Sequence, residues 1–277
     1  MIREEYEVEF ITPCFCAGAD QSKAEVRAPS IRGQLRWWFR VLGGSYEQEK
    51  RVFGGVHDRA ECKEKGAMKS QVTIRVSGVQ NGPGAEIPFS MNPNTEGAYI
   101  WYYASVSGDK KRWWQNGRRG DQNPEGHLAV GTKFILSVHL DEGIRPADFR
   151  QFKTALECFL RFGGLGMRLT RGMGAVFCPK FSGDFEVNKK VSEELLHSAG
   201  FDVYWHAPEH SSWVDGIIQA EQELKGLRSE CSSNSPSRLG SSKPRQTSAV
   251  YFRVVKLGAG VFRLLRFEAP RATRSSA

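Results

Sequence analysis

The 277-residue sequence predicts an α+β protein whose first module is ferredoxin-like. One observation is the order of its periodic stretches: strand, helix, strand, strand, helix, strand, with an extra hairpin between the second and third strands. This order is the split βαβ arrangement, whose open sheet is also the scaffold of RRM-type RNA binding. The other observation is a change of pattern after Ser182-Gly183-Asp184, where a smaller α+β unit begins.

The first strand and the first helix have clear local signals. Apolar and acidic side chains alternate over 6–12, which is typical of a half-buried strand. A helix begins at Pro29, where Ser30 can accept a hydrogen bond from a free amide of the first turn. Gly43 ends this helix because glycine adopts the left-handed conformation at little steric cost. A second short helix is predicted over 46–53.

The rest of the first module follows the same two periodicities. Pro146 opens a helix with apolar residues at helical spacing, and the helix stops at Gly163-Gly164. Alternating or β-branched stretches predict strands over 71–79, 99–106, 131–140 and 175–181.

We expect two domains. The N-terminal domain covers 1–181 and contains an inserted hairpin and loop at 80–130, and a smaller α+β domain covers 182–277. The elements predicted for the smaller domain are helices over 192–199 and 211–227, a stretch between them at 201–205, a serine-rich flexible link over 229–243, and a hairpin of 249–256 with 261–267. The pattern leaves open whether this part is a second unit or a half-domain.

Charge and cysteine usage limit the classes of function. The formal net charge is +8 at pH 7, a bias that agrees with nucleic-acid binding and equally with a merely soluble surface. The six cysteines form no C-x-x-C pair, and the charged N-terminal stretch has no apolar signal core. No apolar run approaches the roughly 20 residues that a membrane span needs. We therefore expect a cytoplasmic protein with reduced thiols and no membrane contact.

The helix after Pro29 carries a row of arginines on one flank. The row consists of Arg32, Arg36 and Arg40, at i, i+4 and i+8. Because like charges at this spacing repel, an anion or a carboxylate from elsewhere in the fold is expected opposite them. Trp37 stands above Gly33, nearly opposite the apolar arc. The row is either a solvated flank beside a buried Trp38 or a phosphate-facing edge with an aromatic beside it.

A glycine-rich stretch follows the second long helix. Residues 163–174 include Gly164, Gly166, Gly172 and Gly174, together with Arg168 and Arg171. Missing Cβ atoms let backbone amides approach a ligand closely, and the two arginines add charge. The pattern is neither a P-loop nor a Rossmann fingerprint, because the lysine is missing and the glycines follow a helix. A plain helix-to-strand turn is the alternative.

A basic and aromatic loop is predicted over 107–126. It contains Arg112, Trp113 and Trp114 among glycine, asparagine and aspartate. In an exposed loop the tryptophans would stack on bases. Alternatively, they cap the edge of a core.

The sequence contains no convincing catalytic group, metal site or cofactor motif. His206 and His210 have H-x3-H spacing, but Pro208 between them breaks the helix that would align them on a metal. His57, followed by Asp58, is the one histidine that we consider as an acid or base in RNA cleavage. No G-x-S-x-G nucleophile elbow is present.

Two stretches resemble a known family. The first runs from Thr12 to Ala19 and from Arg27 to Arg40, with Ser30-Ile31-Arg32-Gly33-Gln34-Leu35-Arg36-Trp37-Trp38 at its centre, and is similar to the opening of the first-subunit family of Cmr complexes. The second, 163–176, is similar to the glycine-rich loop of the RAMP superfamily, to which that family belongs. Residues 238–255 are similar to the family's C-terminal segment.

The resemblance implies tandem ferredoxin-like RAMP modules, the second of them smaller or degenerate. It also implies a non-catalytic RNA-binding subunit of a type III-B CRISPR complex for antiviral defence, which holds the 3′ part of guide RNA, its target, or both. The implied partners are guide RNA, target RNA and other Cmr subunits. The chain is compact for a two-module member, and this departure puts the C-terminal contact surface in doubt.

The residues expected to contact RNA are Ser30, Arg32, Gly33, Arg36, Trp37, Arg40, Gly164, Gly166, Arg168, Arg171, Gly172, Gly174, Arg112, Trp113 and Trp114. Two other functions stay open. One is a RAMP-fold endoribonuclease that processes guide-precursor RNA, although no histidine lies close to the glycine-rich loop in sequence. The other is an assembly protein whose arginines meet acidic subunits.

Overall fold

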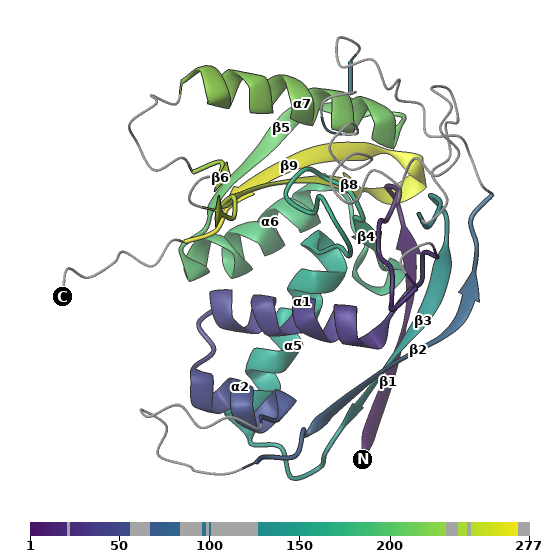
Figure 1. Ribbon diagram of the computed structural model, residues 1–277. Helices are drawn as coiled ribbons and strands as arrows, with labels where there is room; N and C mark the ends of the chain where they lie inside the picture. Colours follow the sequence, from purple (N-terminus) through teal and green to yellow (C-terminus); the bar gives the residue numbers. More distant parts are fainter. Residues whose placement is uncertain are drawn as a thin grey trace, which may run out of the picture.

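The computed structural model describes residues 1–20, 23–55, 67–83, 96–97, 100, 127–230, 238–242 and 245–270. Two antiparallel sheets pack against a shared set of helices (Figure 1). Helices α1 (Ala28–Val41) and α5 (Pro146–Phe162) pack on the first sheet, the second sheet packs on the same helices, and α7 (Trp213–Ser229) covers the outer face of the second sheet.

The first sheet has the strand order β2-β3-β1-β4, and the paired neighbours are antiparallel. Its strands are β1 (Ile2–Phe10), β2 (Val72–Gln80), β3 (Lys133–Leu140) and β4 (Val176–Phe177). Alternation decides which face is buried, since Tyr6, Val8 and Phe10 point to the helices. This order of strands and helices confirms the predicted ferredoxin-like first module.

Local signals explain where the helices of this module begin and end. Proline lies in the first turn of both α1 and α5, and Gly43 after α1 has φ +92°. Helix α2 (Tyr46–Phe53) starts with a capping box between Ser45 and Gln48. Helix α1 differs from the prediction at its start, because it begins at Ala28, and its N-cap residue makes no side-chain cap bond. Ser30 Oγ instead accepts a 3.5 Å hydrogen bond from Cys16 Sγ.

The second part of the chain repeats most of this arrangement. Its elements are α6 (Phe185–Leu195), β5 (Asp202–His210), α7, β8 (Val250–Lys256) and β9 (Phe262–Glu268), with a small hairpin of β6 (Ser241–Ser242) and β7 (Arg245–Gln246). Single 3₁₀ turns occur at Pro179–Phe181, His197–Ala199 and Gly258–Gly260.

The order of strands makes the second part a reduced ferredoxin-like module. The run β5-α7-β8-β9 forms a sheet in the order β5-β9-β8, which corresponds to β1-β3-β2 of the first module. Among the described residues, nothing takes the place that β4 has beside β1. The predicted fold class, with a smaller second module, is confirmed.

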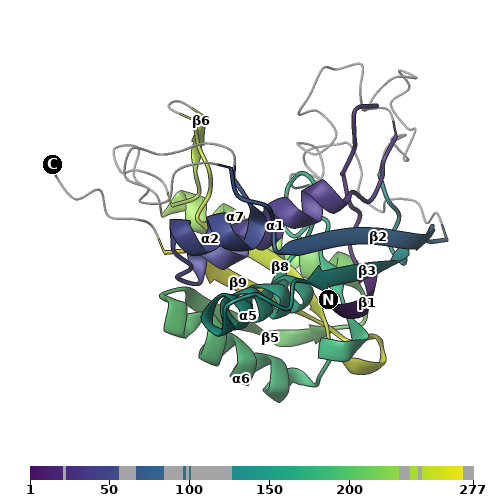
Figure 2. The same ribbon diagram turned by 90° about the horizontal axis from the view of Figure 1, so that it is seen from below.

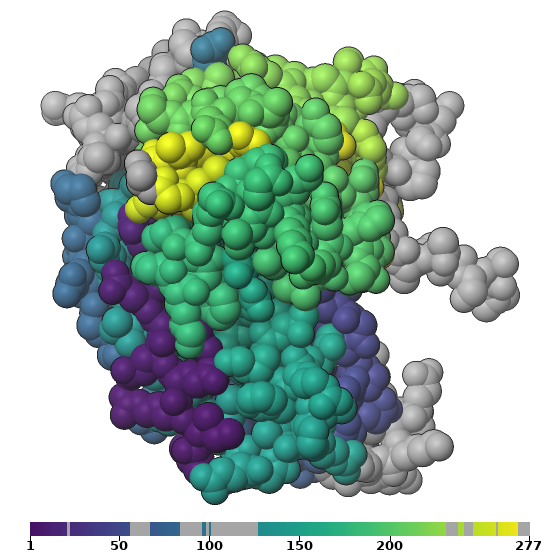
Figure 3. Space-filling model, turned by 180° about the vertical axis from the view of Figure 1, so that it is seen from behind, coloured from purple at the N-terminus to yellow at the C-terminus, as the bar shows by residue number. Residues whose placement is uncertain are grey.

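The two modules share one hydrophobic core. Strand β8 is buried on both faces, with Tyr251 and Val255 toward α1 and α5, and Phe252 and Val254 toward α7. Trp38 of α1 stacks on Phe201 at 6.2 Å. In the view from behind, purple, teal, green and yellow parts of the chain are in direct contact (Figure 3). The domain boundary near residue 181 stays a prediction.

Candidate nucleic-acid interface

One side of α1 faces away from both sheets. Pro29, Gly33, Arg36 and Arg40 project from this side, and we call these four residues the α1 stripe. An added Cβ on Gly33 would meet no atom of the described structure within 4 Å beyond the adjoining residues and the backbone of its own helix. The stripe therefore combines an open helical surface with two guanidinium groups.

The two arginines of the α1 stripe share one carboxylate. Arg36 Nε donates to Glu49 Oε1 at 2.6 Å, and Arg40 Nε lies 3.5 Å from Glu49 Oε2. The Glu49 side chain, on α2, is 2% exposed, whereas those of Arg36 and Arg40 are 41% and 57% exposed. A carboxylate from elsewhere in the fold was one of the two expected counter-ions. Because one negative charge faces two positive charges, a surplus of positive charge remains on an accessible surface.

Arg32 has a different environment. Its guanidinium donates to the carbonyl of Phe53, the last residue of α2, and lies 6.0 Å from the centre of the Phe53 ring. Burial, with the nearby charge of Arg36, lowers the pKa of Arg32. Helix α2 runs beside α1 (Figures 1 and 2), so Arg32 caps the C-terminal end of α2.

Trp37 is partly buried against the second sheet. The centre of its ring lies 5.2 Å from that of Tyr251 in β8 and 4.9 Å from that of Trp38. The sequence placed Trp37 opposite the apolar arc of α1, but the second sheet covers this flank of the helix. Trp37 therefore has protein partners, and base stacking by its ring stays a prediction.

The backbone of the glycine-rich loop, residues 163–174, is tied to the rest of the protein. The amides of Leu165, Met167 and Gly174 donate to the carbonyls of Gly174, Phe15 and Pro13, respectively, each at 2.9 Å. The amide that follows the loop, Ala175 N, donates to Thr12 Oγ1 at 2.9 Å. These amides are therefore occupied by the protein itself.

Close chain packing explains the glycines of this loop. At Gly174, which has φ +66°, an added Cβ would lie 1.9 Å from the carbonyl oxygen of Leu165. At Gly166, which has φ +85°, it would lie 2.4 Å from the carbonyl oxygen of Phe15. Gly164 and Gly172 have similarly close neighbours. The helix-to-strand turn that we left open as an alternative accounts for these contacts.

The two loop arginines differ from each other. Arg168 is the one non-glycine residue with positive φ, 61°, in the part of the chain that the structure describes, and its Nη2 donates to the Ile100 carbonyl at 3.4 Å. Arg171 is buried, with Nη2 donating to the Leu239 carbonyl at 3.2 Å. A strained backbone at an arginine points to a functional position, whereas Arg171 has a place in the core.

Residues 13–16 bring the loop and the start of α1 together. Pro13 and Phe15 accept hydrogen bonds from the loop, and Cys16 contacts Ser30 at the start of α1. The two stretches that sequence reasoning singled out therefore lie on both sides of the same segment.

Several predicted residues lie outside the described part of the chain. These are Arg112, Trp113, Trp114 and His57, together with all of the predicted strand 99–106 except Ile100. Their roles stay predictions.

Sequence reasoning did not single out His127, whose ring lies against Phe15, a residue that is hydrogen-bonded to the glycine-rich loop. The ring of His127 lies 6.0 Å from that of Phe15, whose carbonyl accepts the loop amide of Met167. His127 lies beside Phe15 because the neighbouring residues Cys14 and Leu128 form a bridge, in which they exchange backbone hydrogen bonds of 3.0 and 2.8 Å. No pattern in the sequence predicts this contact, since residues 15 and 127 are far apart along the chain.

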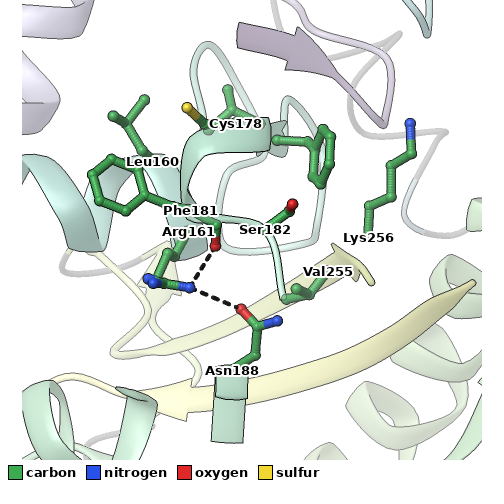
Figure 4. Close-up of a pocket in the computed structure, with 10 residues that line it drawn as sticks. Leu160, Arg161, Cys178, Phe181, Ser182, Asn188, Val255 and Lys256 are labelled. Carbon is green, nitrogen blue, oxygen red and sulfur yellow. Dashed lines mark hydrogen bonds between the residues drawn. The ribbon is translucent and has the colours of Figure 1, made fainter. Parts of the chain in front are cut away.

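A small hollow lies beside α5 (Figure 4). There Arg161 donates to the Phe181 carbonyl and to Asn188 Oδ1, while Lys256 extends away from these groups and pairs with Glu9. Within the described ranges, no group of three or more histidine, cysteine, aspartate or glutamate side chains is arranged to hold a metal ion. None of the described helices is long and apolar enough to cross a membrane.

Comparison with known families decides the relationship that the two motifs indicated. The RAMP superfamily profile matches residues 7–176. The chain belongs to the RAMP superfamily. This range includes both the α1 stripe and the glycine-rich loop.

Curated relatives specify which RAMP proteins are similar. The chain is 29% identical to the CRISPR system Cmr subunit Cmr1-2 of Pyrococcus furiosus over 185 residues, which cover 62% of this chain and 92% of that protein. It is 25% identical to subunit Cmr1-1 of the same organism over 251 residues, which cover 86% of this chain and 63% of that protein. The resemblance to the first Cmr subunit is thus confirmed.

Solved structures show the same fold. Cmr1 from Pyrococcus furiosus in its apo form matches with a TM-score of 0.65 and 20% identity, over 99% of this chain and 89% of that one. A chain of the type III-B Cmr-beta complex bound to cognate target RNA matches with a TM-score of 0.55 and 13% identity, over 96% and 94% of the two chains.

Proposed function

We propose that this protein is a non-catalytic RNA-binding subunit of a type III-B CRISPR (Cmr) ribonucleoprotein in the cytoplasm. It holds the 3′ part of guide RNA, its target RNA, or both, beside other Cmr subunits, and takes part in antiviral defence. The observation that supports this most directly is the α1 stripe, where Arg36 and Arg40 share the single carboxylate of Glu49. The relatives named Cmr subunits and the related complex with target RNA agree with it.

The proposed binding is to the sugar-phosphate backbone. Guanidinium groups bind phosphate oxygens in two-pronged geometry, and Arg36 and Arg40 are accessible enough to do so. The open position at Gly33 lets a strand approach the helix between Ser30 and these arginines. Arg168 adds a third cation from the loop. Such contacts carry no base code, so recognition is independent of sequence.

The test is RNA binding by the isolated chain. The probe is fluorescein-labelled single-stranded polyuridine, and the variant is Arg36→Ala/Arg40→Ala in a Glu49→Gln background, so that no carboxylate is left buried alone. We expect this variant to bind at least about tenfold more weakly than the parent, as the loss of two phosphate contacts requires. Arg75→Ala, an exposed arginine on β2, is the matched control and leaves binding unchanged. Binding that appears only after other Cmr subunits are added would favour the assembly role instead.

One observation favours a second candidate function. His127 lies against Phe15, whose carbonyl accepts an amide of the glycine-rich loop, and the endoribonuclease alternative requires a histidine near that loop. The proteins are incubated with guide-precursor RNA in EDTA. Our proposal predicts no specific cleavage, while cleavage that His127→Ala or His57→Ala abolishes would establish the enzyme.

A further inference from the structure

We propose that two buried arginines, Arg253 and Arg171, make the second module a positioning element of the RNA site, because they fix the glycine-rich loop that carries Arg168. The inference rests on the proposed function and deepens it, since it assigns to the reduced module a role in that same site.

Arg253 connects β8 to the end of α5 and to the middle of the loop. Its side chain is 3% exposed, Nε donates to the Phe162 carbonyl at 2.8 Å, and Nη1 donates to the Leu169 carbonyl at 2.8 Å. Phe162 ends α5 immediately before the loop, and Leu169 follows Arg168. One guanidinium therefore sets the span between the end of the helix and the middle of the loop.

Arg171 makes the reciprocal connection from the loop to the second module. It is 5% exposed and reaches the Leu239 carbonyl at 3.2 Å and Ser248 Oγ at 3.5 Å. Next to it, the amide of Phe252 in β8 donates to the Thr170 carbonyl at 3.3 Å. The loop thus pairs with β8 through one parallel bridge between Arg171 and Phe252.

These contacts determine the backbone at Arg168. The Arg168 carbonyl accepts the amides of Arg171 at 2.8 Å and of Met173 at 3.4 Å, and its φ of 61° is one that arginine rarely adopts. A strained conformation persists only where its surroundings determine it fully. Leu169 follows Arg168 in the chain, and the amide of Arg171 bonds the Arg168 carbonyl. Both Leu169 and Arg171 are hydrogen-bonded to residues of the second module.

The buried arginines also add charge. In the described structure both are hydrogen-bonded to carbonyl and hydroxyl oxygens and neither pairs with a carboxylate. Burial lowers the pKa of each to about 10, so both stay charged at pH 7. In a low-dielectric interior these charges raise the positive potential at the loop, which favours a phosphate there.

The experiment is a double-mutant cycle in the full chain, with the same polyuridine probe. Arg168→Ala and Arg253→Met are measured singly and together. We expect each single change to weaken binding about tenfold, and Arg168→Ala to have little further effect once Arg253 is replaced. The slope of log affinity against log salt falls by about 0.7 in Arg253→Met, as for the loss of one phosphate contact on a single strand.

Arg161→Met is the matched control for stability. Arg161 is also a largely buried arginine that bonds a backbone carbonyl and lies over a phenylalanine ring, but it joins α5 to the turn at Phe181, outside the loop. We expect Arg161→Met to lower the melting temperature and to leave the slope of log affinity against log salt unchanged. Where Arg253→Met fails to fold, Arg253→Lys replaces it, because lysine keeps the charge but cannot span both carbonyls.

The outcomes separate the two claims. If the parent binds RNA and the effects of Arg168→Ala and Arg253→Met are additive, the second module does not position the loop, and the proposed function stands. If Arg161→Met changes binding as much as Arg253→Met does, the effect is general destabilisation and the inference fails. If the parent binds no RNA, with or without Cmr subunits, both claims fail.

Discussion

The arginines of the α1 stripe and those between the loop and the second module have the same chemistry in opposite surroundings. Arg36 and Arg40 are accessible and share one carboxylate, whereas Arg171 and Arg253 are buried and bond neutral oxygens. Accessible surplus charge can meet a phosphate without rearrangement. Buried guanidinium groups instead donate their N–H groups to backbone carbonyls and so hold segments of the chain in place. Arginine density alone therefore does not locate a nucleic-acid site, but accessibility together with the local charge balance does.

The largest effect is expected at the tryptophans, which set the border between the α1 stripe and the core. Trp38→Ala removes a fully buried ring and lowers the free energy of unfolding by about 3–5 kcal/mol. Trp37 is partly buried against Tyr251, so Trp37→Ala costs less, about 2 kcal/mol. Urea denaturation of both variants checks this. If Trp37→Ala left the free energy of unfolding unchanged, the ring of Trp37 would lie on the exposed side of α1 instead.

A third kind of arginine sharpens the comparison, because it is partly buried and is paired with a buried carboxylate. Arg51 makes two hydrogen bonds of 2.7 and 3.0 Å to Asp148, and these hold the pKa of Asp148 below its usual 3.8 against the opposing effect of burial. A lowered pKa contributes stability that is complete above the unfolded-state value and is lost as the pH falls below it. We expect Asp148→Asn to cost about 3 kcal/mol at pH 7.

The pH dependence checks the sign of that effect. The difference in unfolding free energy between the parent and Asp148→Asn shrinks as the pH falls through and below about 4. Chemical denaturation at a series of pH values measures it. A difference that grows toward acid pH would mean that Asp148 is protonated in the folded protein.

Two glycines provide the next contrast, since one is required by packing and the other is not. Gly174→Ala places a methyl group against the Leu165 carbonyl at positive φ and costs about 2–3 kcal/mol. Gly33→Ala adds a methyl group in open space within a helix and stabilises by about 0.5–1 kcal/mol. If RNA lies on the α1 stripe, Gly33→Ala also weakens RNA binding despite the higher melting temperature.

A matched glycine controls for the helix effect. Gly226 of α7 is likewise exposed, with no atom within 4 Å of an added Cβ. Gly226→Ala should raise the melting temperature and leave RNA binding unchanged. If the two glycine variants changed RNA binding equally, RNA would not pass over Gly33.

The smallest effect concerns the shared carboxylate. Glu49→Gln leaves a hydrogen-bond acceptor for Arg36 but removes the carboxylate that, in the described part of the chain, Arg36 and Arg40 share. We expect RNA affinity to rise about threefold at low salt and the gain to fade as salt is added. Fluorescence anisotropy at two salt concentrations measures it. Weaker binding would show that Glu49 orients the arginines more than it neutralises them.

The fold was largely predictable because its signals are local. Helix α2 has the predicted bounds, and α1, α5 and the main strands differ from the predicted ranges by a few residues at their ends. Strand β4 is shorter than predicted because a 3₁₀ turn begins at Pro179. The hairpin of β6 and β7 lies partly within the stretch expected to be a flexible link, since serine and glycine content gave no strand pattern there.

The surroundings of the candidate site were less predictable because they depend on contacts distant in sequence. No periodicity places Glu49 of α2 between Arg36 and Arg40, or the second sheet against Trp37. The glycines of the loop were noticed correctly, but their reason is the close approach of residues 13–16 and α7. The Cys14–Leu128 bridge brings His127 beside Phe15, a contact between residues distant in sequence.

The most direct test of the account is the salt dependence of RNA binding by the parent and by Arg36→Ala/Arg40→Ala in the Glu49→Gln background. The account predicts that the slope of log affinity against log salt becomes shallower by about 1.4, which corresponds to two phosphate contacts on a single strand. An unchanged slope would contradict the claim that the α1 stripe holds the RNA backbone.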